Sequence, residues 1–115
     1  FLYIRNYKPD RWPSGDPIEF RKDRGKYGEV DPSPTKAFMQ AHQENPRFIK
    51  LFKLAFEKRP YEELYDLQRD PSQLNNIAKS PEYEKQKQKL VGIFEKEFGP
   101  TYETAAPFIP ERPSY

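Results

Sequence analysis

The sequence predicts an α+β domain in which a small antiparallel β-sheet packs against a C-terminal helix, with additional helices and a long Pro/Gly-rich loop. Two short segments, residues 1–7 and 62–67, carry the apolar and aromatic patterns of strands. Two longer segments, residues 48–56 and 81–98, place apolar side chains at helical spacing. The 13 prolines among 115 residues leave much of the remaining chain to loops.

Residues 1–7 form the first expected strand. Aromatic residues and Arg5 alternate with the aliphatic Leu2 and Ile4, so this strand has at least one buried face. The alternation has the period of two that places successive side chains on opposite sides of a sheet.

A long irregular segment rich in proline and glycine follows over residues 8–34. Loops of this length are unusual in compact domains and are often functional, although a flexible surface loop fits the composition as well. The densest cluster of recognition-type residues surrounds Trp12, the only tryptophan, with Arg11 and Asp16 nearby. The basic run at residues 21–26 could face an anion such as a sulfated glycan, or lie in solvent.

Two helices are expected after the loop. Ser33 followed by Pro34 has the form of an N-cap with proline at the first helical position, and Asn45 with Pro46 repeats that arrangement. Pro60 ends the second helix, because proline cannot continue the helical hydrogen-bond ladder. The strongest helical stripe in the chain consists of Phe48, Leu51, Phe52, Ala55 and Phe56.

A second strand over residues 62–67 is expected to lead into a turn and a short helix. Asp70 can cap the first backbone amides of that helix, with Pro71 at its first position. The last helix is expected to begin at Ser80 and to run to about Phe98, where a Gly-Pro pair follows.

The composition excludes several classes of function. Lysine and arginine total 20 against 18 acidic residues, and a net charge of +2 argues against a nucleic-acid binder that works by neutralising phosphates. No apolar run approaches the length that spans a membrane. The absence of cysteine excludes disulfides and thiol catalysis. A domain this small has a thin core, so we expect it to pack on a partner domain or on another copy.

The sequence contains no recognisable catalytic or metal-binding motif. His42 is the only histidine, and one histidine cannot form a metal site alone. Glu62 and Glu63 are consecutive on a strand, so they point to opposite faces and do not converge on one substrate atom. We expect Tyr65 to fill a core position and Asp66 to bond the amides of the following turn.

Residues 62–78 read E-E-L-Y-D-L-x-x-D-P-x-x-L-N-N-x-A, and two further segments precede them in order. Residues 2–13 read L-Y-I-R-N-Y-K-P-D-R-W-P, and residues 31–36 contain S-P-T. The longest motif resembles the C-terminal signature of sulfatases, the formylglycine-dependent hydrolases of the alkaline phosphatase superfamily. The other two segments are most similar to bacterial enzymes that resemble heparan N-sulfatase (N-sulfoglucosamine sulfohydrolase).

The resemblance implies that residues 1–100 form the C-terminal subdomain of a larger enzyme. The proline content of residues 101–115 predicts an extended tail that wraps a surface or is disordered. In that family the subdomain holds an antiparallel sheet of about four strands. Part of the sheet, including a hairpin partner before Phe1, would therefore lie outside this chain. The unpaired strand edge would then invite pairing with a second copy. The family resemblance also implies a periplasmic or extracellular enzyme.

The catalytic residues of the family lie far upstream of this signature. A Cys or Ser in a C/S-x-P-x-R motif becomes formylglycine, whose hydrate attacks sulfur, and nearby acids bind calcium. No such motif occurs in this sequence. The resemblance therefore implies that the chain holds no cofactor and is inactive by itself. Calcium and formylglycine are expected in the missing N-terminal catalytic domain, which would be the first partner of this chain.

Four residues are candidates for contact with a sulfated sugar: Arg11, Trp12, Asp16 and Lys36. A basic side chain would pair with a carboxylate or sulfate of the sugar, and the tryptophan would stack on a sugar face. In the alternative arrangement, Trp12 packs beneath the loop and Arg11 pairs with Asp10 or Asp16.

Two other functions remain open from the sequence. A stand-alone interaction module would self-associate by strand pairing through residues 1–7, and a start codon immediately before Phe1 would indicate it. A sulfatase-like C-terminal domain could also belong to a phosphatase or phosphonate hydrolase, which the upstream nucleophile would distinguish.

Overall fold

The computed structural model describes residues 1–18 and 25–99. Its element order confirms the α+β class with a C-terminal helix. The expected extended tail at residues 101–115 lies outside the described residues, as does most of the basic run at 21–26. The elements are β1 (Leu2–Arg5), α1 (Pro34–Ala41), α2 (Ile49–Phe56), β2 (Glu62–Tyr65), a 3-10 turn η1 (Pro81–Tyr83) and α3 (Glu84–Phe98).

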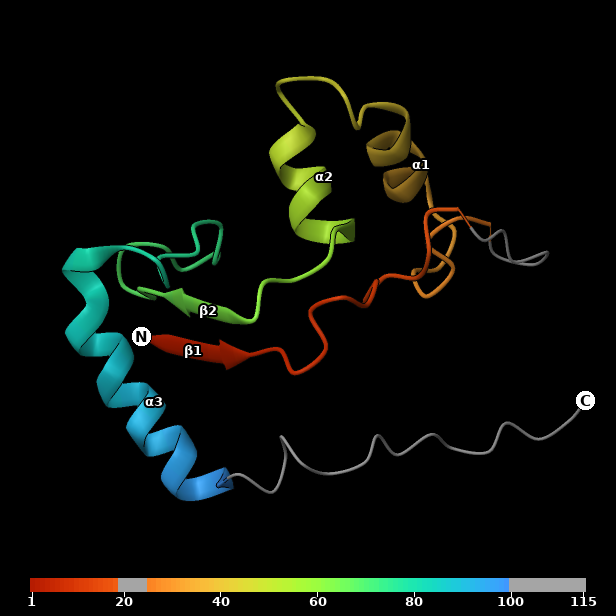
Figure 1. The fold of residues 1–115 in the computed structure, drawn as a ribbon. Helices are drawn as coiled ribbons and strands as arrows, with labels where there is room; N and C mark the ends of the chain where they lie inside the picture. The colour runs from red at the N-terminus through yellow and green to blue at the C-terminus, as the bar shows by residue number, and fades with distance from the viewer. Residues whose placement is uncertain (19–24, 100–115) are drawn as a thin grey trace, which may run out of the picture.

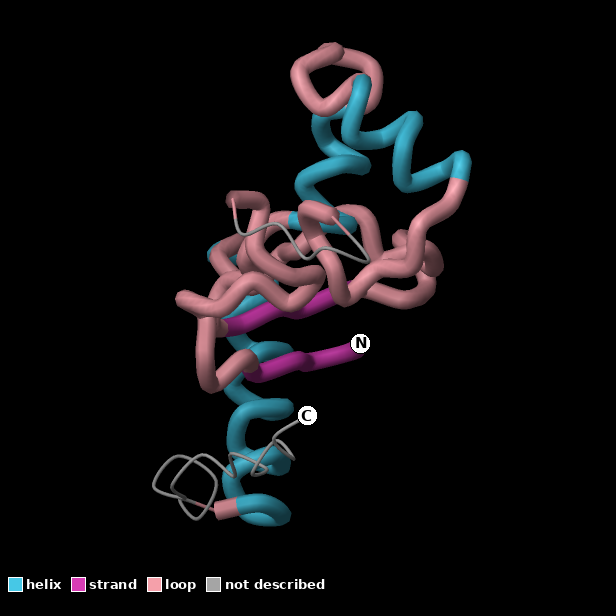
Figure 2. The backbone as a smooth tube through the Cα atoms, turned by 90° about the vertical axis from the view of Figure 1, so that its right-hand side faces the viewer, coloured by secondary structure: helices cyan, strands magenta, loops and turns pink. Residues whose placement is uncertain are grey.

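β1 and β2 pair antiparallel, with Tyr3 opposite Leu64 and Arg5 opposite Glu62. The α1–α2 pair lies on one side of this sheet and α3 on the other (Figure 1). Figure 2 shows the two strands between these helical parts from a second direction. In the described part of the chain the sheet has these two strands, and no strand covers the outer edge of β1.

The two faces of the sheet meet different helices. The Tyr3 ring lies edge-on to that of Phe94 in α3, with centroids 5.7 Å apart, and the Arg5 guanidinium lies 4.8 Å from the same Phe94 centroid. Glu63 and Tyr65 are buried on the opposite face and line a hollow beside α2. The alternation predicted for the first strand is confirmed along β1, and the consecutive acids of β2 point to opposite faces as expected.

The outer edge of β2 is covered by a short segment that begins at Asn76. The Asn76 side chain accepts a hydrogen bond from the Leu64 amide at 3.0 Å and donates to the Glu62 carbonyl at 3.2 Å. The Ile77 amide donates to the Leu64 carbonyl at 2.9 Å. These bonds occupy the backbone groups that a further strand would need.

The prediction of a short helix after Asp70 is wrong. Asp70 does accept hydrogen bonds from the amides of Leu74 and Asn75, at 3.0 and 2.8 Å, but residues 70–79 form turns and extended backbone. Gln73 has a φ of 56°, in the left-handed region, which a right-handed helix cannot include. The capping side chain is therefore present without the helix that it was expected to cap.

The long loop, α1 and α2 together enclose an aromatic cluster. Tyr27, Phe52 and Phe56 are buried, and Trp12 and Met39 pack against them. The Tyr27 ring centroid lies 5.9 Å from that of Phe52 and 4.9 Å from that of Phe56. The predicted apolar stripe of α2 thus supplies two of the three buried rings.

Backbone contacts tie one end of the long loop to the other. The Glu29 amide donates to the Ser14 carbonyl at 3.2 Å. Gly15 has a φ of 93°, and a Cβ at this position would lie 2.7 Å from the backbone nitrogen of Gly28. Only glycine fits this crossing, because any side chain would push the two segments apart.

Candidate functional site

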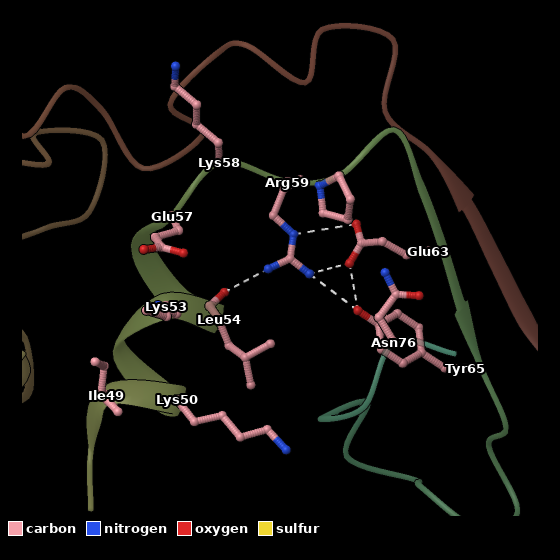
Figure 3. Close-up of a pocket in the computed structure, with 11 residues that line it drawn as sticks. Ile49, Lys50, Lys53, Leu54, Glu57, Lys58, Arg59, Glu63, Tyr65 and Asn76 are labelled. Carbon is pink, nitrogen blue, oxygen red and sulfur yellow. Dashed lines mark hydrogen bonds and ion pairs between the residues drawn. The ribbon is translucent and has the colours of Figure 1, made fainter. Parts of the chain in front are cut away.

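Two hollows on the surface are candidates for binding. The first, which we call the α2–β2 hollow, opens between α2 and β2 and has a volume of about 380 Å³ (Figure 3). Apolar side chains such as Ile49 and Leu54 line it together with three lysines and two glutamates. One lysine, Lys50, donates to the Asn75 side chain at 2.7 Å. The hollow therefore mixes both signs of charge around an apolar centre.

A hydrogen-bond network around Glu63 forms one wall of the α2–β2 hollow (Figure 3). Arg59 pairs with both carboxylate oxygens of Glu63 and donates to the Leu54 carbonyl at 3.0 Å. Tyr65 Oη donates to Glu63 at 2.6 Å, and the Asn6 side chain donates at 2.8 Å. The network therefore connects β1, β2 and the segment that follows α2.

The same contacts determine the charge of Glu63. Burial alone would raise the pKa of this carboxyl, but hydrogen bonds from Arg59, Tyr65 and Asn6, with the positive charge of Arg59, hold the pKa below its usual value. Burial and the bond to Glu63 raise the pKa of Tyr65 to about 12. Glu63 is thus a charged carboxylate whose oxygens already accept hydrogen bonds. This arrangement suits a structural role better than proton transfer.

The second hollow, which we call the cationic hollow, lies where β1 runs into the long loop. Its volume is about 270 Å³, and four of its seven lining residues are basic while none is acidic. It is lined by Arg5, Asn6, Tyr7, Lys8, Arg11, Pro13 and Arg59.

Two of these four cations are already paired. Arg5 Nη2 lies 3.3 Å from a carboxylate oxygen of Glu95 in α3, and Arg59 pairs with the carboxylate described above. Lys8 and Arg11 are exposed, and within the described residues neither side chain has a hydrogen bond or an ion pair. The cationic hollow therefore carries two positive charges that these residues do not neutralise.

A tight turn brings Lys8 and Arg11 together. The Arg11 amide donates to the Lys8 carbonyl at 3.0 Å, and Pro9 stands at the second position of this turn. Proline favours that position because its ring fixes φ near the required value. The sequence analysis singled out Arg11 and missed Lys8. The K-P-D-R pattern was the available signal, because the first and fourth residues of a turn lie close together.

Of the four predicted substrate-contact residues, Arg11 is the one that lines the cationic hollow. No hydrogen bond or ion pair joins it to Asp10 or Asp16 in the described structure. Trp12 is half-buried, and its ring lies edge-on to that of Tyr27 with centroids 6.5 Å apart. Trp12 thus makes packing contacts of the kind expected in the alternative arrangement, in which it lies beneath the loop.

The other two predicted residues, Lys36 in α1 and Asp16 in the loop, both make hydrogen bonds to the long loop. Lys36 is 5% exposed, and its Nζ donates to the carbonyls of Tyr27 and Val30 at 2.9 and 2.8 Å. Asp16 accepts a hydrogen bond from the Ile18 amide at 2.6 Å. The structure does not bring the four residues into one site, and contact with a substrate stays a prediction for each.

The described residues contain no group of three or more His, Cys, Asp or Glu side chains that could hold a metal ion. His42 stacks on Phe38, with ring centroids 4.0 Å apart. Within residues 1–18 and 25–99, no helix combines the length and apolar character needed to cross a membrane.

Comparison with known proteins adds one relationship. No family model matches the chain, and no solved structure matches it significantly. Among curated proteins, the chain is similar to an ulvan-active sulfatase from Formosa agariphila, with 46% identity over 44 residues. The match covers 38% of this chain and 9% of that sulfatase, so the chain spans a small part of its relative's length. The chain is therefore related in sequence to a sulfatase.

Proposed function

We propose that this chain is the non-catalytic C-terminal portion of a sulfatase that hydrolyses sulfate esters or sulfamates of sulfated sugars. The observation that carries the proposal is the 46% identity to a sulfatase over 44 residues. The motif at residues 62–78 adds support, because several of its residues make hydrogen bonds that hold this fold together. Asn76 closes one edge of the sheet, and Glu63 with Tyr65 forms the buried network.

In this proposal the chemistry is supplied by a catalytic domain outside these residues. The sequence holds no C/S-x-P-x-R motif, so formylglycine and calcium would be held by that domain. This chain would support it from the side and lend loop residues to the rim of its pocket. Large apolar side chains that stay exposed on α3, such as Ile93 and Phe98, offer surface for such a contact.

The substrate and the compartment belong to the same proposal. The relative in the comparison is active on ulvan by its name, and the segments at residues 2–13 and 31–36 resemble heparan N-sulfatase-like enzymes. Both point to a sulfated polysaccharide or oligosaccharide as the substrate class. An enzyme that acts on such polymers would work in the periplasm or outside the cell.

Expression of the complete reading frame that contains this chain tests the proposal. We expect the complete protein to release sulfate from a sulfated polysaccharide, and a protein truncated before Phe1 to lose most of that activity. Alanine in place of the nucleophile of the upstream C/S-x-P-x-R motif provides the inactive control. A start codon directly before Phe1 would contradict the proposal. Hydrolysis of phosphate or phosphonate esters would assign the chain to a related enzyme class instead.

The open edge of β1 favours a second candidate function, an interaction module that self-associates by strand pairing. In the described residues this edge has no partner strand, whereas the outer edge of β2 is covered. Sedimentation velocity over a range of chain concentrations separates the candidates. A stable dimer of a protein that has no catalytic domain would favour the module, and a monomer at all concentrations would exclude it.

A further inference from the structure

We propose that the cationic hollow binds a sulfate ester group of a sugar chain, with Lys8 and Arg11 as its charged contacts. This inference rests on the proposed sulfatase function and assigns a binding site within this chain. The two side chains are exposed, stand at the two ends of one turn, and have no ion-pair partner among the described residues.

The frame of the hollow is fixed by partly buried hydrogen bonds. Asn6 and Arg59, two residues of its wall, both donate to Glu63, whose side chain is only 3% exposed. Glu63 is not itself a lining residue of this hollow. The acid therefore holds the wall in place without presenting its negative charge to a bound anion.

The charge balance favours an anion of low charge. Arg5 and Arg59 are each matched by one glutamate, which leaves the charges of Lys8 and Arg11. A sulfate ester carries one negative charge and several acceptor oxygens at neutral pH. The planar guanidinium can donate two parallel hydrogen bonds to such oxygens, and the ammonium adds a compact charge beside it.

The α2–β2 hollow is less suited to the same ligand. Its lining includes Glu57 and Glu63, and its lysines are distributed around an apolar centre. One of them, Lys50, already donates to a neighbouring side chain, and Lys58 lies 5.1 Å from the centroid of the Trp12 ring. An anion would therefore meet repulsion there that is absent from the cationic hollow.

Calorimetric titration of the chain with a heparin-derived hexasaccharide tests the inference. We expect the double variant K8Q/R11Q to bind the hexasaccharide at least about tenfold more weakly than the natural chain, because both charged contacts are lost. The matched control is K85Q/K89Q, which removes two exposed lysines of α3 and the same total charge. We expect this control to change the affinity less than about twofold.

A second arm of the experiment identifies the group that is bound. The chemically desulfated hexasaccharide keeps its carboxylates, and we expect its binding to be undetectable under the same conditions. Equal binding of the desulfated sugar would overturn the assignment to sulfate. Equal losses in the two double variants would overturn the site. Circular dichroism of each variant confirms that the fold is retained, which the exposure of Lys8 and Arg11 leads us to expect.

The outcome can be separated from that of the proposed function. A complete enzyme that releases sulfate while K8Q/R11Q binds the sugar like the natural chain would reject the hollow and keep the sulfatase. Selective loss of binding in K8Q/R11Q, in a protein with no catalytic domain, would keep the hollow as a sulfated-sugar site and reject the sulfatase.

Discussion

At the scale of single residues, Glu63 joins β2 and the residues just before it to Asn6, which lies 57 positions away in the sequence. It accepts from Arg59 before β2, from Tyr65 within β2 and from Asn6 after β1. A buried carboxylate is tolerated only when its charge and its acceptor oxygens are satisfied. Each partner is therefore more costly to remove than its single hydrogen bond suggests, because the remaining charge would stay buried.

Because the pKa of Glu63 is lowered in the folded state, the free energy of unfolding depends on pH. The carboxylate favours folding fully above the usual glutamate pKa of about 4.3, and this contribution is lost as the pH falls through the lower pKa of the folded state. We expect the free energy of unfolding of the natural chain to fall more steeply than that of E63Q below about pH 4. Urea denaturation between neutral and acid pH measures the difference, and parallel pH curves would contradict the assignment.

Tyr7 presents the opposite case, a buried polar atom without a partner. Its hydroxyl is inaccessible and makes no hydrogen bond in the described structure. An unmet donor of this kind costs about 1–3 kcal/mol. We therefore expect Y7F to leave the free energy of unfolding unchanged or to raise it by about 1 kcal/mol. Chemical denaturation checks this, and a loss of more than about 1 kcal/mol would reveal a bond that the hydroxyl makes.

At the scale of elements, the segment that begins at Asn76 completes the sheet without being a strand. The Asn76 side chain makes hydrogen bonds with the Leu64 amide, the Ala78 amide and the Glu62 carbonyl. We expect N76A to lower the free energy of unfolding by about 2 kcal/mol, because the Leu64 amide and the Glu62 carbonyl of β2 would lose their hydrogen-bond partner. The neighbouring N75A is the control, because that side chain makes one exposed bond to Lys50. Equal losses in the two variants would contradict the role of Asn76.

Several local patterns were predictable from the sequence, but the helix starts predicted at Asn45 and Asp70 were wrong, since α2 begins at Ile49 with Phe48 as its N-cap and no helix follows Asp70. The Ser33 side chain caps α1 through the Lys36 amide at 3.0 Å. Asp66 accepts from the amides of the turn that follows it, and Tyr65 is 2% exposed, so both predictions are confirmed. Each depends on a few adjacent residues, for which side-chain preferences suffice.

Features that depend on distant partners were not predictable. Leu51 belongs to the apolar stripe of α2 but is 47% exposed, because the aromatic cluster receives only Phe52 and Phe56 from that helix. Arg5 and Arg59 line the same hollow because β1 pairs with β2. No local sequence pattern specifies the register of that pairing. Lys8 is a different case, because the K-P-D-R turn that places it beside Arg11 is a local pattern.

At the scale of the whole molecule, the apolar interior is divided between two places. One is the cluster of Tyr27, Phe52 and Phe56, and the other lies between the sheet and α3, where Tyr3 meets Phe94. Neither is large, so each buried ring carries a large share of the stability.

The aromatic cluster gives a direct test of this division. Phe56 is 3% exposed, and we expect F56A to lower the free energy of unfolding by about 3–5 kcal/mol. A loss of this size approaches the whole stability of a small domain, so the variant should be partly unfolded at 25 °C. The exposed Leu51 on the same helix gives the control, L51A, which should lose less than about 1 kcal/mol. Thermal denaturation compares the two, and similar midpoints would contradict the predicted difference.

The coverage of one sheet edge limits how copies of this chain can assemble. Growth of a fibre by edge addition requires two open edges on every molecule, so that each new copy leaves a place for the next. Here β2 is blocked by the segment at Asn76, and β1 is the edge left open in the described structure. Two copies that pair through β1 would use up the open edge of both, and the assembly would close at two. The geometry therefore permits a symmetric pair and opposes a polymer.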